Sequence, residues 1–236
     1  MLFRSETHSA TPRSNPTLSN FTIIGVPDST KSDIGVLLRA GTSAKCYNFI
    51  VQGFEEACID IDDEVTWNNA YTDVGTWTTL SNNLIFKDSI IWDDNPTEVR
   101  NFKPREAATT DPATLATNCV ELFMMDQNTG NLVANPFLKA PYSTSAPNFA
   151  PEATYPAYDE GNVTVPSDSF FTAVDFKGGV NPSSDWTAGW TTSAGAPTGN
   201  NPDDPGGGTI TQVGSDTFYL SRSEERRVGK ECRSRW

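Results

Sequence analysis

The chain has 236 residues, with 17 Lys and Arg against 30 Asp and Glu and a net charge of −13. A surface this acidic repels nucleic acids and anionic membranes, which excludes both as partners, whereas cations such as calcium remain admissible. No apolar run reaches membrane-spanning length, and the single histidine, His8, excludes a multi-histidine zinc site within this chain.

The two chain ends differ from the rest. The C-terminal "RSEERRVGKECRSRW" (222–236) resembles the translation of a short-read sequencing adapter, and "LFRS" (2–5) resembles the same adapter at the other end. We therefore expect residues 1–5 and 222–236 to be artefacts and residues 6–221 to be a fragment of a longer protein. Without these ends 10 basic and 27 acidic residues remain, a net charge of −17.

Three cysteines remain as well: Cys46, Cys58 and Cys119. Three cysteines do not build a disulfide framework, and at most one pair could form. We interpret them as small buried side chains.

Short apolar runs bounded by turn-forming residues predict β-strands and an all-β class. The last of these runs also suits a helix, because Leu115, Cys119, Leu122 and Phe123 would share one face, and the sequence leaves that choice open. The runs are residues 20–25, 35–40, 45–53, 58–62, 84–92 and 119–125.

Some of these runs repeat. "NFTIIG" (20–25) and "NFIVQG" (48–53) share the form Asn-Phe-x-Ile/Val-x-Gly, and "DSIIWD" (88–93) is a looser third copy. The spacing from Ile23 to Ile50 is 27 residues, that from Leu37 to Ile59 is 22, and the third copy follows Ile50 by 40. A period in the twenties predicts a stacked β-solenoid, in which each coil covers the core of its neighbour. An antiparallel sandwich with accidental likeness between strands is the alternative.

This reading predicts the organisation of the chain. Residues 6–126 form β-helix coils, with a loop inserted at a coil corner at about residues 64–83. Residues 127–194 form a Pro-rich extended strip followed by an aromatic segment. Residues 195–221 form a Gly/Pro linker and the start of a further segment.

Four stretches together resemble a largely uncharacterised family of secreted bacterial proteins with a right-handed parallel, pectin-lyase-like β-helix. They are residues 36–67, 84–94, 135–161 and 170–192, and the likeness extends over residues 18–192. Its most specific part is the ending "FFTAVDFKGGVNPSSDWTAGW", while Tyr155-Pro-Ala replaces the family's usual Ser-Pro-Ala. The resemblance implies C-terminal coils with an aromatic cap and a secreted or cell-envelope location. It implies no catalytic residue.

The acidic cluster Asp60, Asp62, Asp63 and Glu64 is the candidate metal site. Carboxylates at i and i+2 of a strand point the same way, so Asp60 and Asp62 would share one face while Ile59 and Ile61 face the core. Calcium prefers several oxygen ligands of this kind, and it is the one cofactor we consider. A solvated acidic face is the alternative, because the spacing matches no known calcium loop.

The aromatic residues near the C-terminal end are predicted to cap the last coil, whose apolar cross-section must be covered. A platform on which carbohydrates stack is the alternative. The residues are Phe170, Phe171, Phe176, Trp186 and Trp190.

These features favour a structural or adhesive role at the cell surface, with glycans or cell-surface components as candidate partners. The alternative is a carbohydrate-active enzyme, either a polysaccharide lyase or a glycosidase, whose active coils lie partly upstream. A glycosidase needs two opposed carboxylates, for which Asp60, Asp62 or Asp93 are available. A lyase acting on uronates would use cations such as Arg39, Lys45 and Lys87.

Overall fold

A computed structural model describes most of the chain up to residue 188. The chain divides into two compact units, one of Met1–Pro141 with Asn148–Thr187 and one of Tyr142–Pro147 with Ala188–Trp236, and each is described by itself. In the second unit, β13 (Thr211–Gln212) and β14 (Phe218–Tyr219) pair antiparallel. The described residues are 2–3, 8–9, 11–26, 32–94, 100–104, 117–143, 145–153, 156–158, 162–188, 211–212 and 218–219.

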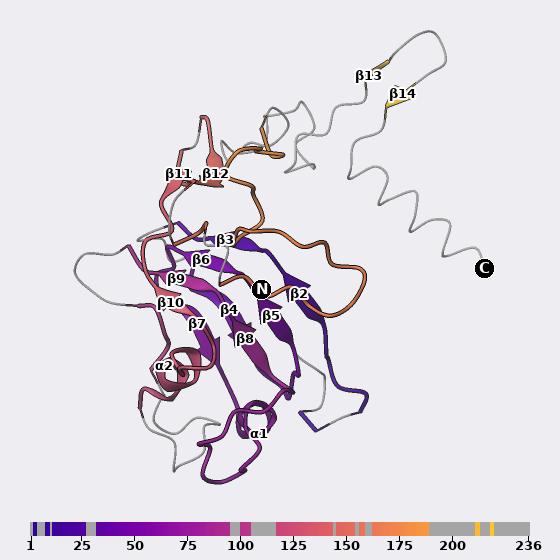
Figure 1. The fold of residues 1–236 in the computed structure, drawn as a ribbon, viewed down its shortest axis with the longest axis vertical. Helices are drawn as coiled ribbons and strands as arrows, with labels where there is room; N and C mark the ends of the chain where they lie inside the picture. The colour runs from indigo at the N-terminus through magenta and orange to yellow at the C-terminus, as the bar shows by residue number, and fades with distance from the viewer. Residues whose placement is uncertain are drawn as a thin grey trace. The chain divides into compact units, whose positions relative to one another are not determined.

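Three parallel sheets make up the body of the first unit (Figure 1). Sheet A contains β1 (Leu2–Phe3), β4 (Ile34–Leu38) and β7 (Ala57–Ile61). Sheet B contains β2 (Thr17–Ser19), β5 (Lys45–Tyr47) and β8 (Ile85–Lys87). Sheet C contains β3 (Thr22–Ile24), β6 (Ile50–Gln52), β9 (Ile90–Trp92) and β10 (Leu132–Val133). The predicted all-β class is confirmed, and the parallel pairing contradicts the antiparallel alternative.

The three copies of the sequence repeat lie side by side in sheet C. Ile23 pairs with Val51, and Ile50 pairs with Ile90, which confirms the spacing of 40 residues. The two shorter spacings are wrong by one residue. The offset is 28 residues between β3 and β6 and 23 between β4 and β7, where Val36 pairs with Ile59. A slip of one residue would turn every side chain of a strand to the opposite face.

Two predicted strands, 45–53 and 84–92, are each divided in two by a corner residue. Asn48, with φ 57°, separates β5 from β6, and Asp88, with φ 51°, separates β8 from β9. Asn20 (φ 58°) and Gly130 (φ 65°) hold the equivalent positions before β3 and β10. Asn, Asp and Gly tolerate this left-handed backbone, which bends the chain from sheet B into sheet C.

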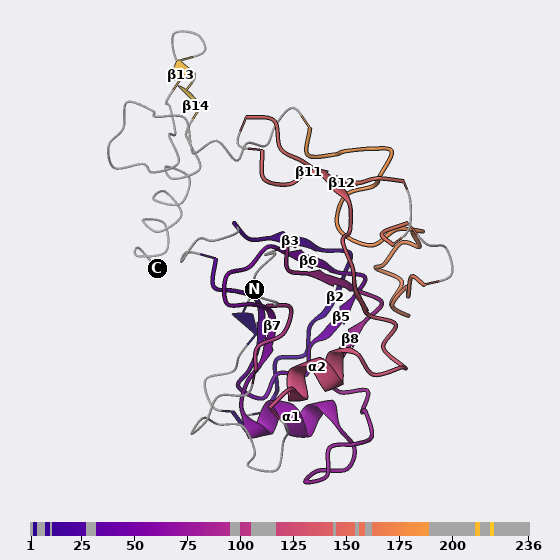
Figure 2. The same ribbon diagram turned by 90° about the vertical axis from the view of Figure 1, so that its left-hand side faces the viewer.

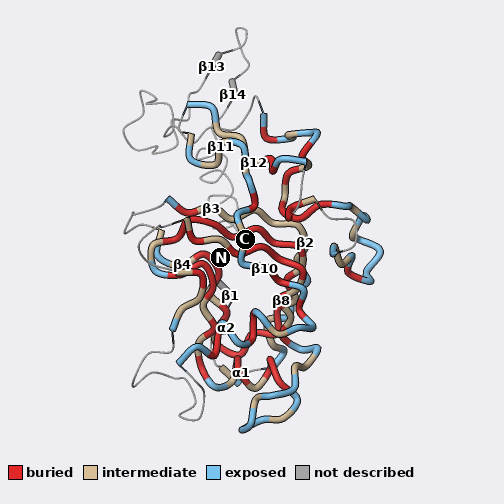
Figure 3. The backbone as a smooth tube through the Cα atoms, turned by 60° about the vertical axis from the view of Figure 1, so that its left-hand side comes forward, coloured by how far each residue is buried: buried red, intermediate tan, exposed pale blue. Residues whose placement is uncertain are grey.

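The hydrophobic core lies between the three sheets, and Figure 3 shows the buried backbone that surrounds it. Phe49 is fully buried, with its ring 5.1 Å from that of Phe21 and 5.4 Å from that of Phe86. Other core residues come from all three sheets, among them Val36, Leu38, Cys46, Val51, Ile59, Ile61 and Ile91. From β2 onward the chain passes through sheets B, C and A in turn, and we call each such passage a winding. The Phe49 ring therefore links three successive windings.

Two short helices enlarge this core (Figure 2). Helix α1 (Glu64–Ala70) lies within the predicted inserted loop. Helix α2 (Cys119–Met124) occupies residues predicted as a strand, so the helical alternative is the correct one. Cys119 and Phe123 are buried as that alternative expected, whereas Leu122 is 56% exposed and Leu115 lies outside the described residues. Among the described helices, none has the length and apolar character needed to cross a membrane.

The helices contact each other through aromatic rings. The Phe123 ring lies 6.3 Å from Trp67, edge to face, and 6.1 Å from Tyr71. Four residues of α2 join the same core cluster as Phe86 of β8. Sheet B has no fourth described strand, and α2 precedes β10 where such a strand would come in the chain.

The segment after β10 covers the outer face of sheet C. Strands β11 (Leu138–Ala140) and β12 (Asn148–Pro151) pair antiparallel. Residues 156–158 and 162–187, here called the strip, follow them. Ala157 and Leu138 pack on Ile50 and Ile90, which point away from the main core.

Hydrogen bonds fix the strip to the corner residues. Asn20 Nδ2 donates to Phe176 O at 2.8 Å, and Asn48 Nδ2 donates to Thr164 O at 2.7 Å. Lys177 is fully buried, and its Nζ donates to Asp88 O and to Asn162 O, both at 2.5 Å. The strip thus contacts three windings through their corners.

Replacing Phe49 with Ala should lower the free energy of unfolding by about 3–5 kcal/mol, because the change leaves a cavity among three windings. Phe137→Ala is the matched control, since that ring is 52% exposed. Urea denaturation followed by circular dichroism measures both. Equal effects of the two substitutions would contradict the described core.

Candidate functional site

The largest described cavity is a groove on the outer face of sheet B, with a volume of about 560 Å³. Its floor is formed by outward-facing residues of β5 and β8, which include Tyr47, Ile85 and Lys87. One wall is the loop 78–82 and the other is the turn 126–129, with Thr164 of the strip at its edge. We call it the sheet B groove.

The first wall is shaped by Asp73. Its carboxylate accepts hydrogen bonds from Thr79 N at 2.8 Å, from Thr78 N at 3.0 Å and from the hydroxyl of Thr76 at 2.7 Å. The hydroxyl of Thr78 donates to it as well. Tyr71 and Leu80 form a β-bridge beneath this turn. The loop is therefore organised by its own hydrogen bonds.

The second wall is a turn that follows α2. The hydroxyl of Thr129 donates to Met124 O at 2.9 Å and to Asp126 O at 2.8 Å. Asp126 Oδ1 accepts from Asn128 N at 2.8 Å. Asn131 Nδ2 donates to Phe86 O at 2.9 Å, which connects the turn to β8. Both walls are thus attached to the scaffold by hydrogen bonds.

Tyr47 and Lys87 are the principal hydrogen-bond donors of the floor. They are paired neighbours across β5 and β8. Among the described residues, no side chain forms an ion pair with the Lys87 ammonium group, which lines the groove. Burial, and to a lesser extent Cys46 and Asp88, raise the pKa of Tyr47, so its phenol stays protonated at neutral pH.

The other two predicted cations do not converge with Lys87. Arg39 lies 3.2 Å from Asp62, and Lys45 Nζ donates to Asn15 Oδ1 at 2.5 Å. Neither lines the groove, and Asp126 is the only carboxylate among its described lining residues.

The residues of the predicted acidic metal site lie in different environments. Ile59 and Ile61 are buried as predicted, and Asp62 pairs with Arg39. Asp63 is only 2% exposed, and Glu64 is exposed in the first turn of α1. In the described part of the chain, no three His, Cys, Asp or Glu side chains are grouped to hold a metal ion. Calcium binding at Asp60 and its neighbours stays a prediction.

Asp63 has a structural role that the sequence interpretation missed. Its carboxylate caps α1 by accepting from Thr66 N at 2.9 Å, and it also accepts from the backbone N–H of Ala40 on the preceding winding. An Asp directly before a helix is a recognisable cap signal. The signal was hidden because residues 64–70 were expected to form a loop.

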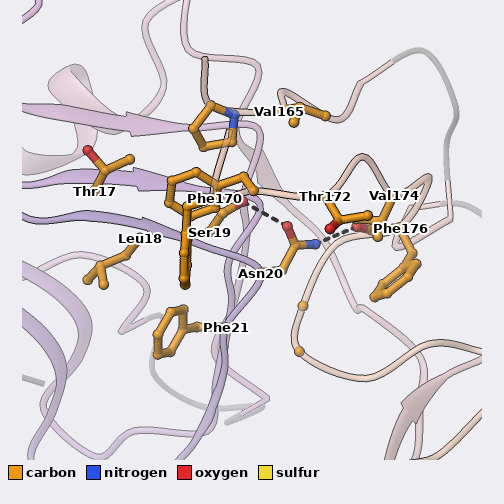
Figure 4. A pocket seen from close by; sticks show the side chains of 14 residues that line it. Thr17, Leu18, Ser19, Asn20, Phe21, Val165, Phe170, Thr172, Val174 and Phe176 are labelled. Carbon is orange, nitrogen blue, oxygen red and sulfur yellow. Dashed lines mark hydrogen bonds between the residues drawn. The ribbon is translucent and has the colours of Figure 1, made fainter. Parts of the chain in front are cut away.

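Three of the five predicted cap residues lie beside β2. Phe170, Phe171 and Phe176 line a second cavity together with Thr17, Leu18 and Ser19 of β2 (Figure 4). Phe176 is buried, whereas Phe170 is 84% and Trp186 58% exposed. Trp190 lies outside the described residues. Their role as a cap of the last coil stays a prediction.

The three cysteines are buried and free, in agreement with the interpretation as small core side chains. Burial raises the pKa of Cys46 to about 12 and that of Cys58 to about 12. Thiolate formation at neutral pH is therefore suppressed.

In a Cys232→Ser background, the remaining thiols should not react with a disulfide reagent at pH 8 until urea unfolds the protein, when all three should react. Absorbance of the released thiol measures this. Rapid reaction of Cys46 or Cys58 under native conditions would contradict their described burial.

Protonation of Asp73 at low pH should weaken the hydrogen bonds that organise the loop 73–79. Hydrogen bonds from the hydroxyls of Thr78 and then Thr76 lower the pKa of Asp73 below its usual range. Because the folded pKa is the lower one, the stabilisation is complete above the unfolded value of about 3.9 and is lost as the pH falls from there toward the folded pKa. The amide shifts of Thr78 and Thr79, followed by NMR, should therefore titrate with a midpoint below about 3.9. Asp73→Asn should abolish this titration, and a midpoint at or above that value would contradict the hydrogen bonding.

Comparison with known proteins places these features in a family. No curated protein and no solved structure matches the sequence significantly. Residues 4–126, just over half of the chain, match the family model described as a pectate-lyase-like β-helix domain. The matched region includes the strands of sheets A and B and the first three of sheet C, except for β1. The chain therefore belongs to the family of pectate-lyase-like β-helix domains.

Proposed function

We propose that this protein is a secreted or cell-surface right-handed parallel β-helix with a structural or adhesive role, which binds glycans in the sheet B groove. The family supports the β-helix, and the parallel sheets agree with it. The secreted location follows from the resemblance of residues 18–192 to secreted proteins.

The composition of the groove carries the glycan proposal. Its lining combines an ammonium group, a phenol, several hydroxyls and the amides of Asn82, Gln127 and Asn128 with the apolar side chains of Leu80 and Ile85. Ligand sites typically combine an apolar surface with a few fixed polar groups. A sugar offers the matching partners, since it carries many hydroxyl groups around an apolar ring face.

The same composition favours binding over hydrolysis. Glycoside hydrolysis needs two carboxyl groups on opposite sides of the scissile bond. Of the lining residues that the structure describes, Asp126 alone carries a carboxylate, and Asn128 already donates to it. The lone cation, Lys87, would contribute a hydrogen bond and a charge to a bound glycan.

Lys87→Ala should weaken binding of a polysaccharide by about fivefold to tenfold, because it removes the ammonium group from the floor of the groove. Lys45→Ala is the matched control, since it removes a cation from the same face of sheet B without altering the lining. The probe is a panel of immobilised neutral and uronate-containing polysaccharides, followed by titration calorimetry on those that bind.

Absence of binding to the whole panel, or equal effects of the two substitutions, would refute glycan recognition by this groove. Release of shorter sugar chains during incubation would instead support the alternative, a carbohydrate-active enzyme.

A further inference from the structure

A second cavity of about 360 Å³ lies between β2 and the strip (Figure 4). Its apolar lining includes Val165, Pro166, Phe170, Phe171 and Phe176. Leu18, Phe21 and Val174 add to this apolar lining, and the polar side chains around the cavity are those of Thr17, Ser19, Asn20 and Thr172. We call it the aromatic cavity.

None of the described residues that line the aromatic cavity is ionisable. This is notable in a chain with 47 charged residues and a net charge of −13. A charged ligand would lose hydration here without finding a counter-charge. The cavity therefore suits an uncharged ligand.

Hydrogen bonds hold the segment that carries the exposed rings. Phe170 N donates to Asp168 Oδ1 at 2.8 Å, and the Phe170 and Phe171 rings meet edge to face with their centroids 5.3 Å apart. Beside the cavity, Trp186 Nε1 donates to Gly179 O at 2.6 Å, and Gly179 N donates to Thr22 Oγ1 of β3 at 2.9 Å. These contacts restrict the segment that carries Phe170 and Trp186, and such restriction reduces the entropy cost of binding.

Two polar groups are available beside these rings. In the described part of the chain, no hydrogen bond engages the hydroxyls of Thr17 and Thr172, both of which line the cavity. Each hydroxyl can donate and accept a hydrogen bond. Exposed aromatic rings next to unengaged hydroxyls match a ligand that has an apolar face and hydroxyl groups at its edge.

We propose that the aromatic cavity binds a neutral sugar residue, whose apolar face stacks on Phe170 while its hydroxyl groups contact Thr17 and Thr172. Trp186 extends the aromatic surface along the glycan. This site is separate from the sheet B groove and does not depend on the function proposed for it. An acyl chain fits less well, because Phe170 is 84% exposed and would leave such a chain in water.

Titration calorimetry with neutral gluco-, manno-, galacto- and xylo-oligosaccharides tests the proposal. At least one series should bind, and Phe170→Ala and Trp186→Ala should each weaken that binding by about fivefold or more. Phe137→Ala is the matched control, because it removes an exposed ring that lies outside the cavity and should leave the affinity unchanged. Circular dichroism confirms that each variant is folded.

Lys87→Ala separates the two sites. It should leave binding at the aromatic cavity unchanged, just as Phe170→Ala should leave binding at the sheet B groove unchanged. Failure of every neutral oligosaccharide, or equal loss with Phe170→Ala and Phe137→Ala, would overturn the proposal. Binding of the uncharged apolar dye N-phenyl-1-naphthylamine without any oligosaccharide binding would overturn it in favour of an apolar ligand.

Discussion

The left-handed corner between sheets B and C is the constraint on which the rest of the structure depends. Most strands of sheets B and C have three residues, so each contributes few backbone hydrogen bonds, and the corner side chains add others. Asn48 Nδ2 donates to Ser19 Oγ at 3.1 Å, Phe49 N donates to Ser89 Oγ at 2.9 Å, and Ser89 N donates to Asn131 Oδ1 at 2.9 Å. Each bond joins one winding to the next. Because unsatisfied polar groups are costly in a buried corner, these residues hold the windings in one register.

The sequence predicted those parts of the fold that are encoded locally. The Asn-Phe repeat identified strands that do lie side by side, because each winding must place the same residue types at the same corner. The spacing was misjudged by one residue, since Ile23 was matched to Ile50 although the shared motif aligns it with Val51. Helix α2 was left open because its six residues are too few for periodicity to decide. Its helical state is supported by packing of Phe123 on Trp67, which no local pattern reveals.

The candidate sites were harder to predict, because both join segments that are far apart in the chain. The sheet B groove combines β5, β8, the loop 78–82 and the turn 126–129. Lys87 was singled out, but nothing in the sequence placed it beside Tyr47 or showed that Arg39 and Lys45 have other partners. The aromatic residues were recognised as a group, yet their contact with β2 spans about 150 residues of chain. Membership of the family describes the scaffold, and the function must be sought in these surfaces.

The strip has a mechanical consequence. It is held at Asn20, Asn48 and Asp88, which belong to three successive windings. The buried amine of Lys177 donates to the carbonyl of Asp88 and to that of Asn162 within the strip. A force that pulled on the strip would act on three windings, because each of these attachments joins it to a different one. Tension at either end of the strip would therefore be shared among the three windings instead of acting on one of them.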